Sequence, residues 1–183
     1  MAIIKTLFKG LYIFEPRIFE DKRGYFFESY NSNVWKEAGI DHVFVQDNES
    51  RSKFGTVRGL HYQIGDYAQT KLVRVTKGRV LDVVVDLRKE EPTYGQSFSI
   101  ELSNKNKKQF LIPRGFAHGF ATLSKSAVFS YKCDNFYSGE NEFGINPLDP
   151  TLKIDWQIEK SDYVISEKDE KAPSFGKHKP VFD

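Results

Sequence analysis

The feature that most limits the fold is a series of short alternating segments between Lys71 and Cys133, where helical periodicity is hard to find. Successive side chains of a strand point to opposite faces. In residues 79–87, the apolar side chains that would share one face are Leu81, Val83, Val85 and Leu87. Asp82 and Asp86 would lie on the other face. We therefore expect a strand with one face in a core and one polar face.

Glycine and proline punctuate the connections between further alternating segments, which are residues 97–102, 109–112 and 119–123. The cationic run at residues 104–108 is typical of a solvated turn between strands. Many short antiparallel strands joined in this way predict a mainly β sandwich or barrel, and a jelly roll or cupin-type barrel fits 183 residues. That length predicts a single domain over residues 1–183. Pro173, Gly176 and Pro180 favour an extended tail over residues 173–183.

Helices are secondary in this pattern. One is expected to begin with Ser32 or Asn33 as its N-cap and to end at Gly39, a residue type that suits a helix C-terminus. A second is expected to begin at Ser166, because Ser166-Glu167-Lys168-Asp169 fits the capping-box pattern. From this pattern alone, Asp169 could cap a turn or take part in chemistry.

Composition excludes several classes of partner. The 27 Lys and Arg residues nearly balance the 25 Asp and Glu residues without forming a basic stripe, so nucleic acid is not expected as a partner. No stretch approaches the roughly 20 apolar residues of a membrane span, and the amino terminus lacks the apolar segment of a signal peptide. The single cysteine, Cys133, cannot close an intramolecular disulfide and is expected to be packed. We therefore expect a cytoplasmic protein without a membrane partner.

Two of the four histidines lie beside glycines in strand-like segments. His61 belongs to residues 58–63, and His118 belongs to residues 113–120. If Leu60 faces the core between the sheets, His61 points away from that core; in a barrel that holds a ligand, His61 would line the mouth. A purely structural role remains open for both histidines.

Metal binding is the sharpest alternative, because barrel proteins of this class often hold a metal with a His-x-His pair and a carboxylate. Here the second position is Gln63, which would share a strand face with Gly59 and His61. His61 and His118 could supply two ligands, but a neutral amide is a poor third and no nearby glutamate completes the set. We therefore expect no metal.

Six segments, some of them described above, together match the motifs of one known family. They are Asp21–Glu28, Gln46–Asn48, Arg58–Gln63, Gln69–Val75, Asp82–Arg88 and Pro113–Phe120. In order and spacing these segments resemble the dTDP-4-dehydrorhamnose 3,5-epimerase family, and the resemblance covers nearly the whole chain. It implies a cupin-type jelly-roll homodimer that uses no cofactor and acts on a dTDP-4-keto-6-deoxy sugar.

The resemblance also implies roles for residues that match the family's motifs. His61 is similar to the general base, Asp169 to its orienting partner, and Tyr131 to the acid on the opposite face of the sugar. Lys71 resembles the residue that stabilises the enolate oxygen, with His118 at the same end of the substrate. Without the resemblance, Tyr131 would be interpreted as core packing and Lys71 as a solvated strand residue.

A second group of residues resembles the family's nucleotide site. Positions similar to those that hold the nucleotide and its diphosphate are Arg23, Glu28, Gln46, Asn48, Arg58, Glu142 and Lys168. Tyr137 resembles the residue that stacks on thymine, although by itself it would be an ordinary loop aromatic. Residues 146–150 depart from the family's short Trp-containing turn, and residues 64–67 replace its prolines.

These residue types suit the chemistry that the resemblance implies. Protons at C3 and C5 flank a C4 ketone, so removing either one places negative charge on the ketone oxygen. A lysine ammonium stabilises that charge, and a histidine oriented by a carboxylate is a suitable base near neutral pH. Inversion then requires a proton from the opposite face, which a tyrosine phenol can give.

The sequence supports three hypotheses of different classes. The first is an isomerase that converts dTDP-4-dehydro-6-deoxy-D-glucose to dTDP-4-dehydro-L-rhamnose, and a relative that epimerises one carbon would keep the same motifs. The second is a jelly roll that binds a sugar nucleotide without turning it over. The third is a metal-dependent cupin enzyme.

Overall fold

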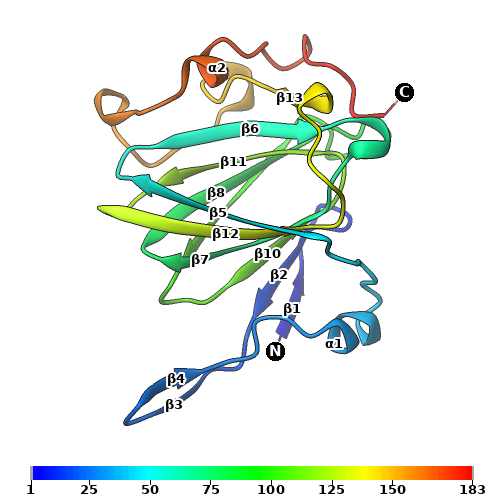
Figure 1. Cartoon of the computed structure of the whole chain (residues 1–183). Coiled ribbons are helices and arrows are strands. Elements are labelled where there is room, and N and C mark those ends of the chain that lie inside the picture. The colour runs from blue at the N-terminus through cyan, green and yellow to red at the C-terminus, as the bar shows by residue number, and fades with distance from the viewer. Residues whose placement is uncertain (1, 183) are drawn as a thin grey trace.

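The computed structural model describes residues 2–182, which form mainly β-strands (Figure 1). The strands are β1 (Ala2–Lys5), β2 (Tyr12–Glu15), β3 (Phe19–Asp21), β4 (Gly24–Phe26), β5 (Gln46–Lys53), β6 (Val57–Gln63), β7 (Lys71–Lys77), β8 (Arg79–Asp86), β9 (Ser97–Ser103), β10 (Gln109–Ile112), β11 (Phe116–Thr122), β12 (Ser126–Cys133) and β13 (Glu142–Gly144). The helices are α1 (Ser32–Glu37) and α2 (Glu167–Glu170), with short 3₁₀ turns η1 (Gly65–Tyr67), η2 (Gly139–Asn141), η3 (Pro150–Leu152) and η4 (Lys160–Asp162).

Two antiparallel sheets form the body of the molecule. The first has six strands in the order β1-β2-β10-β7-β12-β5, and the second has five in the order β13-β6-β11-β8-β9. Apart from β1–β2 and β8–β9, neighbouring strands in each sheet are not consecutive in the chain, which is the connectivity of a jelly roll. The predicted fold class, a mainly β cupin-type jelly roll, is confirmed.

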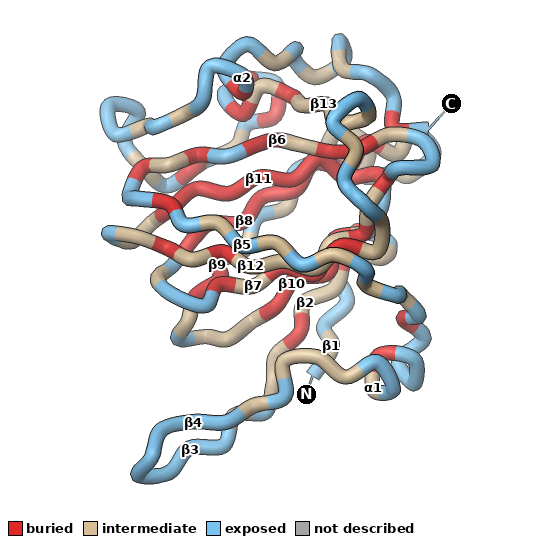
Figure 2. Tube along the Cα trace, in the orientation of Figure 1, coloured by how far each residue is buried: buried red, intermediate tan, exposed pale blue. Residues whose placement is uncertain are grey.

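Apolar side chains from both sheets fill the space between them. This interior core contains Phe8, Leu11, Val73, Val75, Val80, Val84, Leu102, Phe110, Ile112, Phe116, Phe120, Ala127 and Phe129. Phe120 of β11 and Phe129 of β12 stack across the interior with their ring centroids 4.4 Å apart. Figure 2 shows the buried residues concentrated along these central strands. Because each fully buried side chain of this size contributes about 1.5–3 kcal/mol, the interior core is a main source of stability.

Strand β8 is buried on both faces, so the expectation that its second face would be an ordinary polar face was wrong. Asp82 and Asp86 are both fully buried. Their face belongs to the interior, where Val80 and Val84 join the interior core. The opposite face packs in an outer core that includes Leu81, Val83, Val85 and Leu87. The alternation was correct, but the two faces of β8 lie in two different cores. The face with Asp82 lies between the two sheets, and the face with Leu81 lies beneath a covering segment from elsewhere in the chain.

The covering segment is the chain that follows β13, and it crosses the outer face of the five-stranded sheet (Figure 1). Trp156 is buried there, and its indole Nε1 donates a hydrogen bond to a backbone carbonyl at 2.9 Å. Residues 173–182 contain no helix or strand, yet they are anchored. The Tyr62 hydroxyl donates to the carbonyl of Lys179 at 2.6 Å, and Val181 is buried.

Helix α1 begins one residue earlier than predicted, with Asn31 rather than Ser32 or Asn33 as its N-cap. The Asn31 side chain accepts a hydrogen bond from the Asn33 backbone N–H, and asparagine is a favoured cap of this kind. Gly39 follows the helix with a φ of +78°, a conformation that glycine adopts without strain. The helix places Trp35 on Phe14 of the six-stranded sheet, with ring centroids 3.9 Å apart.

Strands β3 and β4 form a separate hairpin, which we call the arm, and they pair only with each other. Figure 1 shows the arm projecting away from the two sheets, and all of its strand residues are exposed (Figure 2). Large apolar side chains on it include Phe19 and Phe26. Within residues 2–182, no helix is both long and apolar enough to cross a membrane.

Candidate active site

His61 and Asp169 form a hydrogen-bonded pair between β6 and helix α2, 108 residues apart in sequence. The distance from His61 Nε2 to Asp169 Oδ1 is 2.6 Å. Asp169 is buried, and its second oxygen accepts from the Gly59 N–H at 3.3 Å. Ser166 caps the helix by accepting from the Asp169 backbone N–H at 3.2 Å. The capping pattern and the histidine contact therefore coexist, because the cap uses the backbone of Asp169 and leaves its carboxylate for His61.

The electrostatics of Asp169 determine which nitrogen of His61 carries a proton. Burial alone would raise the pKa of Asp169, but hydrogen bonds from His61, Gly59 and Ser166 lower it below the usual value. An ionised carboxylate has no proton to donate, so Nε2 of His61 must be the donor. Nδ1 of the neutral ring is then an acceptor, as a general base requires.

His61 faces the interior between the sheets. Leu60 and Tyr62, its neighbours on β6, belong to the outer core beneath the covering segment. His61 is instead the Cα partner of His118 on β11, whose ring lies 6.0 Å from that of Phe129 in the interior. Of the two orientations that the sequence left open, the structure has the one in which His61 faces a potential ligand.

A bulge breaks the simple alternation that was expected around His61. Arg58 is opposite Phe120, but His61 is opposite His118, so two residues of β6 face one of β11. Glycine is required at this position, since a Cβ on Gly59, where φ is +118°, would lie 2.6 Å from the Cα of Gly119. Because residues opposite each other share a face, the bulge directs Arg58 and His61, three apart in sequence, to the same side.

The six-stranded sheet presents a second set of site residues to the same interior. Its register aligns two rows across β5, β12 and β7, which are Gln46–Cys133–Lys71 and Asn48–Tyr131–Val73. Val73 is part of the interior core, so its row faces inward, and the row two positions along β12 faces the same way. The predicted residues Lys71, Tyr131, Gln46 and Asn48 therefore lie on the sheet opposite His61.

Glu142 on β13 links these two sets electrostatically. Its charge acts to raise the pKa of Tyr131, and it also opposes the burial that lowers the pKa of Lys71 overall. Coulomb interactions weaken with distance, so Glu142 lies within electrostatic range of both groups. Glu142 also lies on the strand that pairs with β6, where Gly144 is opposite His61.

Lys71 and Tyr131 have pKa values displaced in opposite directions by the same cause. Burial lowers the pKa of Lys71, while the negative charges of Glu142 and Asp82 partly offset that effect. Burial raises the pKa of Tyr131, reinforced by Cys133 and Glu142. Displaced pKa values in one cluster of side chains are typical of functional sites. Tyr131 keeps its proton at neutral pH and can act as an acid.

His118 is held by Asp82, a residue that the sequence analysis assigned to an ordinary polar face. His118 Nε2 lies 3.0 Å from both carboxylate oxygens of Asp82, and both residues are buried. Burial raises the pKa of Asp82, against the opposing effects of His118 and Lys71. The sequence did contain a signal, because the apolar run Val83-Val84-Val85 is typical of a strand buried on both faces.

Cys133 is buried and packed, as predicted, but it lies within the cluster. It is the Cα partner of Lys71, and its sulfur accepts a hydrogen bond from the Asn48 amide at 3.8 Å. Burial raises the pKa of the Cys133 thiol to about 11. At neutral pH the thiol is protonated and is a poor nucleophile.

The predicted nucleotide-site residues fall into two groups. Near His61, the Tyr137 hydroxyl donates to Glu142 at 3.3 Å, and the Lys168 ammonium pairs with the same carboxylate. Gln46 donates to Asn48 at 3.1 Å, and Arg58 donates to a buried serine on β5 at 3.0 Å. These side chains come from β5, β6, β13, α2 and the loop after β12, and they surround the open edges of the two sheets.

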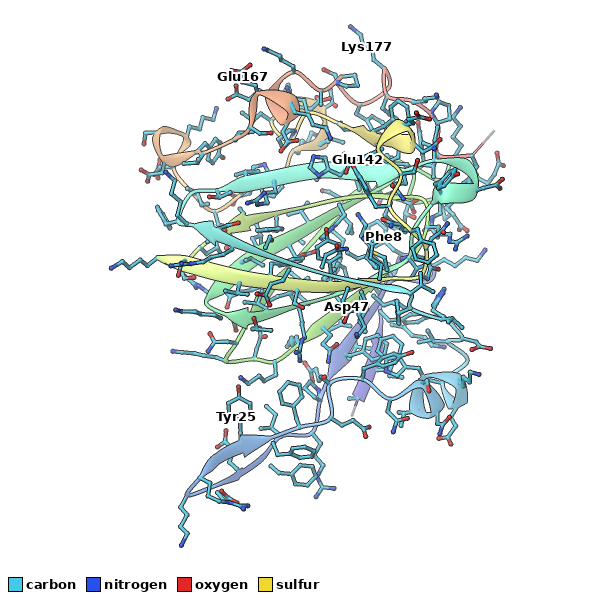
Figure 3. All side chains as sticks on the ribbon, in the orientation of Figure 1. Phe8, Tyr25, Asp47, Glu142, Glu167 and Lys177 are labelled. Atoms are coloured by element: carbon cyan, nitrogen blue, oxygen red, sulfur yellow. The ribbon has the colours of Figure 1, made fainter. Side chains whose placement is uncertain are left out.

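Arg23 and Glu28 form the other group, and within residues 2–182 of a single chain they make no hydrogen bond to the residues around His61. Arg23 lies at the turn of the arm and bonds to Asp21, while Glu28 accepts from the Asn31 side chain at 3.2 Å. Figure 3 shows Tyr25 on the arm at one end of the molecule, whereas Glu142 lies beside β6.

Gln63 uses both of its amide hydrogens and its oxygen in hydrogen bonds within the protein, which bears on the metal hypothesis. Its amide nitrogen donates to the carbonyls of Tyr67 and Phe136, and its oxygen accepts from the Ser138 N–H. Among residues 2–182, no group of three or more His, Cys, Asp or Glu side chains is arranged to hold a metal ion.

Residues 146–150, where the chain departs from the family pattern, support helix α2. The Asn146 amide donates to the carbonyl of Glu170 at 2.7 Å, and its backbone N–H donates to the carbonyl of Pro173 at 3.0 Å. Asp149 accepts from the Phe175 N–H at 2.6 Å. Hydrogen bonds from the segment that differs from the family pattern therefore stabilise the helix that carries Asp169 and the residues that follow it.

Comparison with known proteins agrees with this geometry. A family model described as dTDP-4-dehydrorhamnose 3,5-epimerase matches residues 5–177. The chain is 53% identical over 176 residues to the dTDP-4-dehydrorhamnose 3,5-epimerase of Pseudomonas aeruginosa, and the match covers 96% of both proteins.

Two solved structures are similar over almost their whole length. The dTDP-4-dehydrorhamnose 3,5-epimerase of Elizabethkingia anophelis is 52% identical with a TM-score of 0.91, covering 96% of this chain and 97% of that one. The dTDP-6-deoxy-D-glucose-3,5-epimerase of Legionella pneumophila, in complex with dTDP-4-keto-L-rhamnose, is 48% identical with a TM-score of 0.91, covering 96% and 93%. The chain belongs to the dTDP-4-dehydrorhamnose 3,5-epimerase family.

Proposed function

We propose that this protein is an isomerase that epimerises dTDP-4-dehydro-6-deoxy-D-glucose at C3 and C5 to give dTDP-4-dehydro-L-rhamnose. One observation carries the proposal: His61 on one sheet, paired with Asp169 of helix α2, faces Lys71 and Tyr131 on the other sheet. A base and an acid on opposite sides of a ligand are what inversion of a carbon centre requires. Membership of the family, and a relative solved with dTDP-4-keto-L-rhamnose, support this substrate class.

In the proposed first step, Nδ1 of His61 removes the proton from the carbon beside the C4 ketone. The ring becomes an imidazolium, and the ionised Asp169, 2.6 Å from Nε2, stabilises the new positive charge. Burial of Asp169 strengthens this interaction, since less water screens it.

The electrons left on the sugar move to the ketone oxygen, where Lys71 is proposed to stabilise the enolate. An ammonium in a water-poor environment stabilises an anion more strongly than one in bulk solvent. Asp82 and Glu142 favour the charged form of Lys71 against its burial. His118, fixed by Asp82, is proposed to contact the same end of the sugar.

Tyr131 is proposed to return a proton from the opposite face, which inverts the carbon. Its raised pKa keeps the phenol protonated before the step. After each transfer, a proton from solvent reloads Tyr131, and His61 releases the proton that it removed. The same cycle at the second carbon completes the double epimerisation.

The nucleotide is proposed to lie between the open edges of β5 and β13. Arg58 and Lys168 supply positive charge for the diphosphate, and Gln46, Asn48 and Glu142 supply hydrogen-bonding groups. Tyr137, with 57% of its surface exposed, offers a ring on which thymine can stack.

We propose a homodimer in which each arm completes the site of the partner. Arg23, at the turn of the exposed arm, and Glu28, in the segment that follows the arm, match the nucleotide site, but the arm projects away from β6, the strand that carries His61. The exposed Phe19 and Phe26 of the arm would be buried by such an exchange. A cytoplasmic location is proposed as well, because the only cysteine is a free, buried thiol.

The decisive experiment follows deuterium from heavy water into the substrate by NMR. Label at both C3 and C5, with formation of the L-sugar, is the expected result. Label at one carbon would instead identify a single-carbon epimerase. Binding without label would identify a sugar-nucleotide-binding protein, and His61→Ala should then leave affinity unchanged with no turnover to lose.

A further inference from the structure

The loop between β12 and η2, residues 134–138, is held by side-chain amides instead of by strand pairing. We propose that Gln63 is a positioning residue that fixes this loop, and with it the Tyr137 ring, relative to His61. The inference rests on the proposed function, in which Tyr137 stacks on the nucleotide base. It adds a residue that neither the motif roles nor the reaction steps use.

Both amide hydrogens of Gln63 and one of the two acceptor positions of its oxygen are used within the protein. Nε2 donates to the carbonyl of Tyr67 at 2.7 Å and to that of Phe136 at 3.2 Å, and Oε1 accepts from the Ser138 N–H at 2.7 Å. The side chain is 5% exposed. Reversing the amide would place its oxygen against two carbonyls, so the orientation is set by its partners.

Two more amides hold the same loop. Gln46 Oε1 accepts from the Tyr137 N–H at 3.0 Å, and Gln69 Nε2 donates to the Asn135 carbonyl at 2.9 Å. Gln46 lies on β5 of the six-stranded sheet, whereas Gln63 lies on β6 of the five-stranded sheet. The loop therefore spans both sheets. These hydrogen bonds attach the backbone of a half-buried to exposed loop to both sheets, so they restrict where the loop can lie.

Gln63 couples the loop to the site through the strand that it shares with His61. It lies two residues beyond His61 on β6 and is the Cα partner of Glu142 on β13. Glu142 in turn accepts the Tyr137 hydroxyl at 3.3 Å. Gln63 thus sets the span between the proposed base and the proposed stacking ring. A ring held in place loses less freedom when a ligand binds than one on a loose loop.

The first test is Gln63→Met, which keeps the length of the side chain and removes its three hydrogen bonds. We expect KM for the sugar nucleotide and Kd for dTDP to rise about ten-fold, the scale of losing part of a base–aromatic stack. The kcat value should stay within about three-fold, since His61, Lys71 and Tyr131 are untouched. Gln96→Met is the matched control: this exposed glutamine donates to the Pro92 carbonyl at 3.2 Å, and its replacement should change neither value.

A second variant keeps the proposal testable if Gln63→Met does not fold, as judged by circular dichroism. Gln63→Glu retains the acceptor for Ser138 but loses both donors, so it should also raise KM and Kd. In a Tyr137→Ala background, either change at Gln63 should add less than about two-fold, because its effect acts through that ring.

Equal effects in the presence and absence of the Tyr137 ring would refute the inference, as would a fall in kcat with KM unchanged. If the wild-type protein exchanges substrate protons and both Gln63 variants bind dTDP with normal affinity, the inference is refuted but the proposed function stands. A wild-type protein that neither binds dTDP nor exchanges protons would overturn the proposed function, and the role of Gln63 with it.

Discussion

Replacing Asp169 with asparagine isolates the contribution of its charge to the His61 base. The shape of the side chain is kept, but an amide can donate to Nε2 of His61. The ring proton then moves to Nδ1, and the atom that should accept the substrate proton is blocked. General base catalysis of this kind contributes on the order of 10²- to 10⁴-fold, so most of that factor is at risk.

A second contribution comes from the imidazolium that forms during the reaction. For charge centres about 4 Å apart and an effective dielectric constant near 20, the attraction is about 4 kcal/mol. The His61 side chain is 29% exposed, so screening by solvent reduces this to roughly 2 kcal/mol, or about 30-fold in rate. With the blocked tautomer, we expect Asp169→Asn to lower kcat on the order of 10³-fold.

The assay is loss of the substrate's C3 and C5 protons in heavy water, measured by NMR at saturating and limiting substrate. KM should change little, because Asp169 contacts His61 and the backbone of Gly59 and not the nucleotide residues. Asp155→Asn, on the exposed surface of the covering segment, is the matched control and should be fully active. A variant that retains kcat within a few-fold, or that loses only affinity, would refute the assignment of Asp169 as the orienting carboxylate.

Three further perturbations test other parts of the structure. Tyr131→Phe should abolish formation of the epimerised sugar, while NMR still detects slow exchange of the C–H proton with solvent; inversion at the wild-type rate would contradict the acid role. Lys71→Met should lower kcat by about 10²- to 10³-fold, the cost of removing a charge-stabilising donor, and an unchanged kcat in a steady-state assay would exclude that role. Asp86→Ala should lower the free energy of unfolding by about 3 kcal/mol in urea denaturation, because it breaks a buried pair with Arg88. Burial acts to raise the pKa of Asp86, but hydrogen bonds from Arg88 and Thr93 lower it overall. The stabilisation by this pair is therefore fully present above the unfolded-state pKa, which is about 4, and is lost as the pH falls through the lower folded-state pKa. The difference in unfolding free energy between wild type and variant should shrink from about pH 7 to about pH 3. A difference that stays constant over this range would contradict the prediction.

The fold class could be predicted from the sequence because strand alternation is a local property. Residues 79–87 alternate as expected, and Gly39 and Ser166 mark helix ends from their own chemistry. The number of buried faces could not be predicted in this way. Whether the second face of β8 meets water or protein depends on strands and loops that are distant in sequence, and Asp82 is buried because His118 and Lys71 lie beside it.

The candidate site shows the same division. The family resemblance selected His61, Lys71, Tyr131 and Asp169 as candidates, whereas their residue types alone left structural roles open. Tertiary structure determined that Asp169 lies 2.6 Å from His61, that a bulge at Gly59 directs His61 inward, and that Gln63 forms hydrogen bonds with the loop at residues 134–138. It also showed that Arg23 lies on an arm away from its own site.

Chemistry that depends on the identity of a side chain was therefore determined by the sequence. Register, bulges and the burial of a charge were decided only by the tertiary structure. The physical reason is that these properties arise from contacts between segments many residues apart, such as the 108 residues between His61 and Asp169. The free energy of such contacts depends on how the whole chain packs.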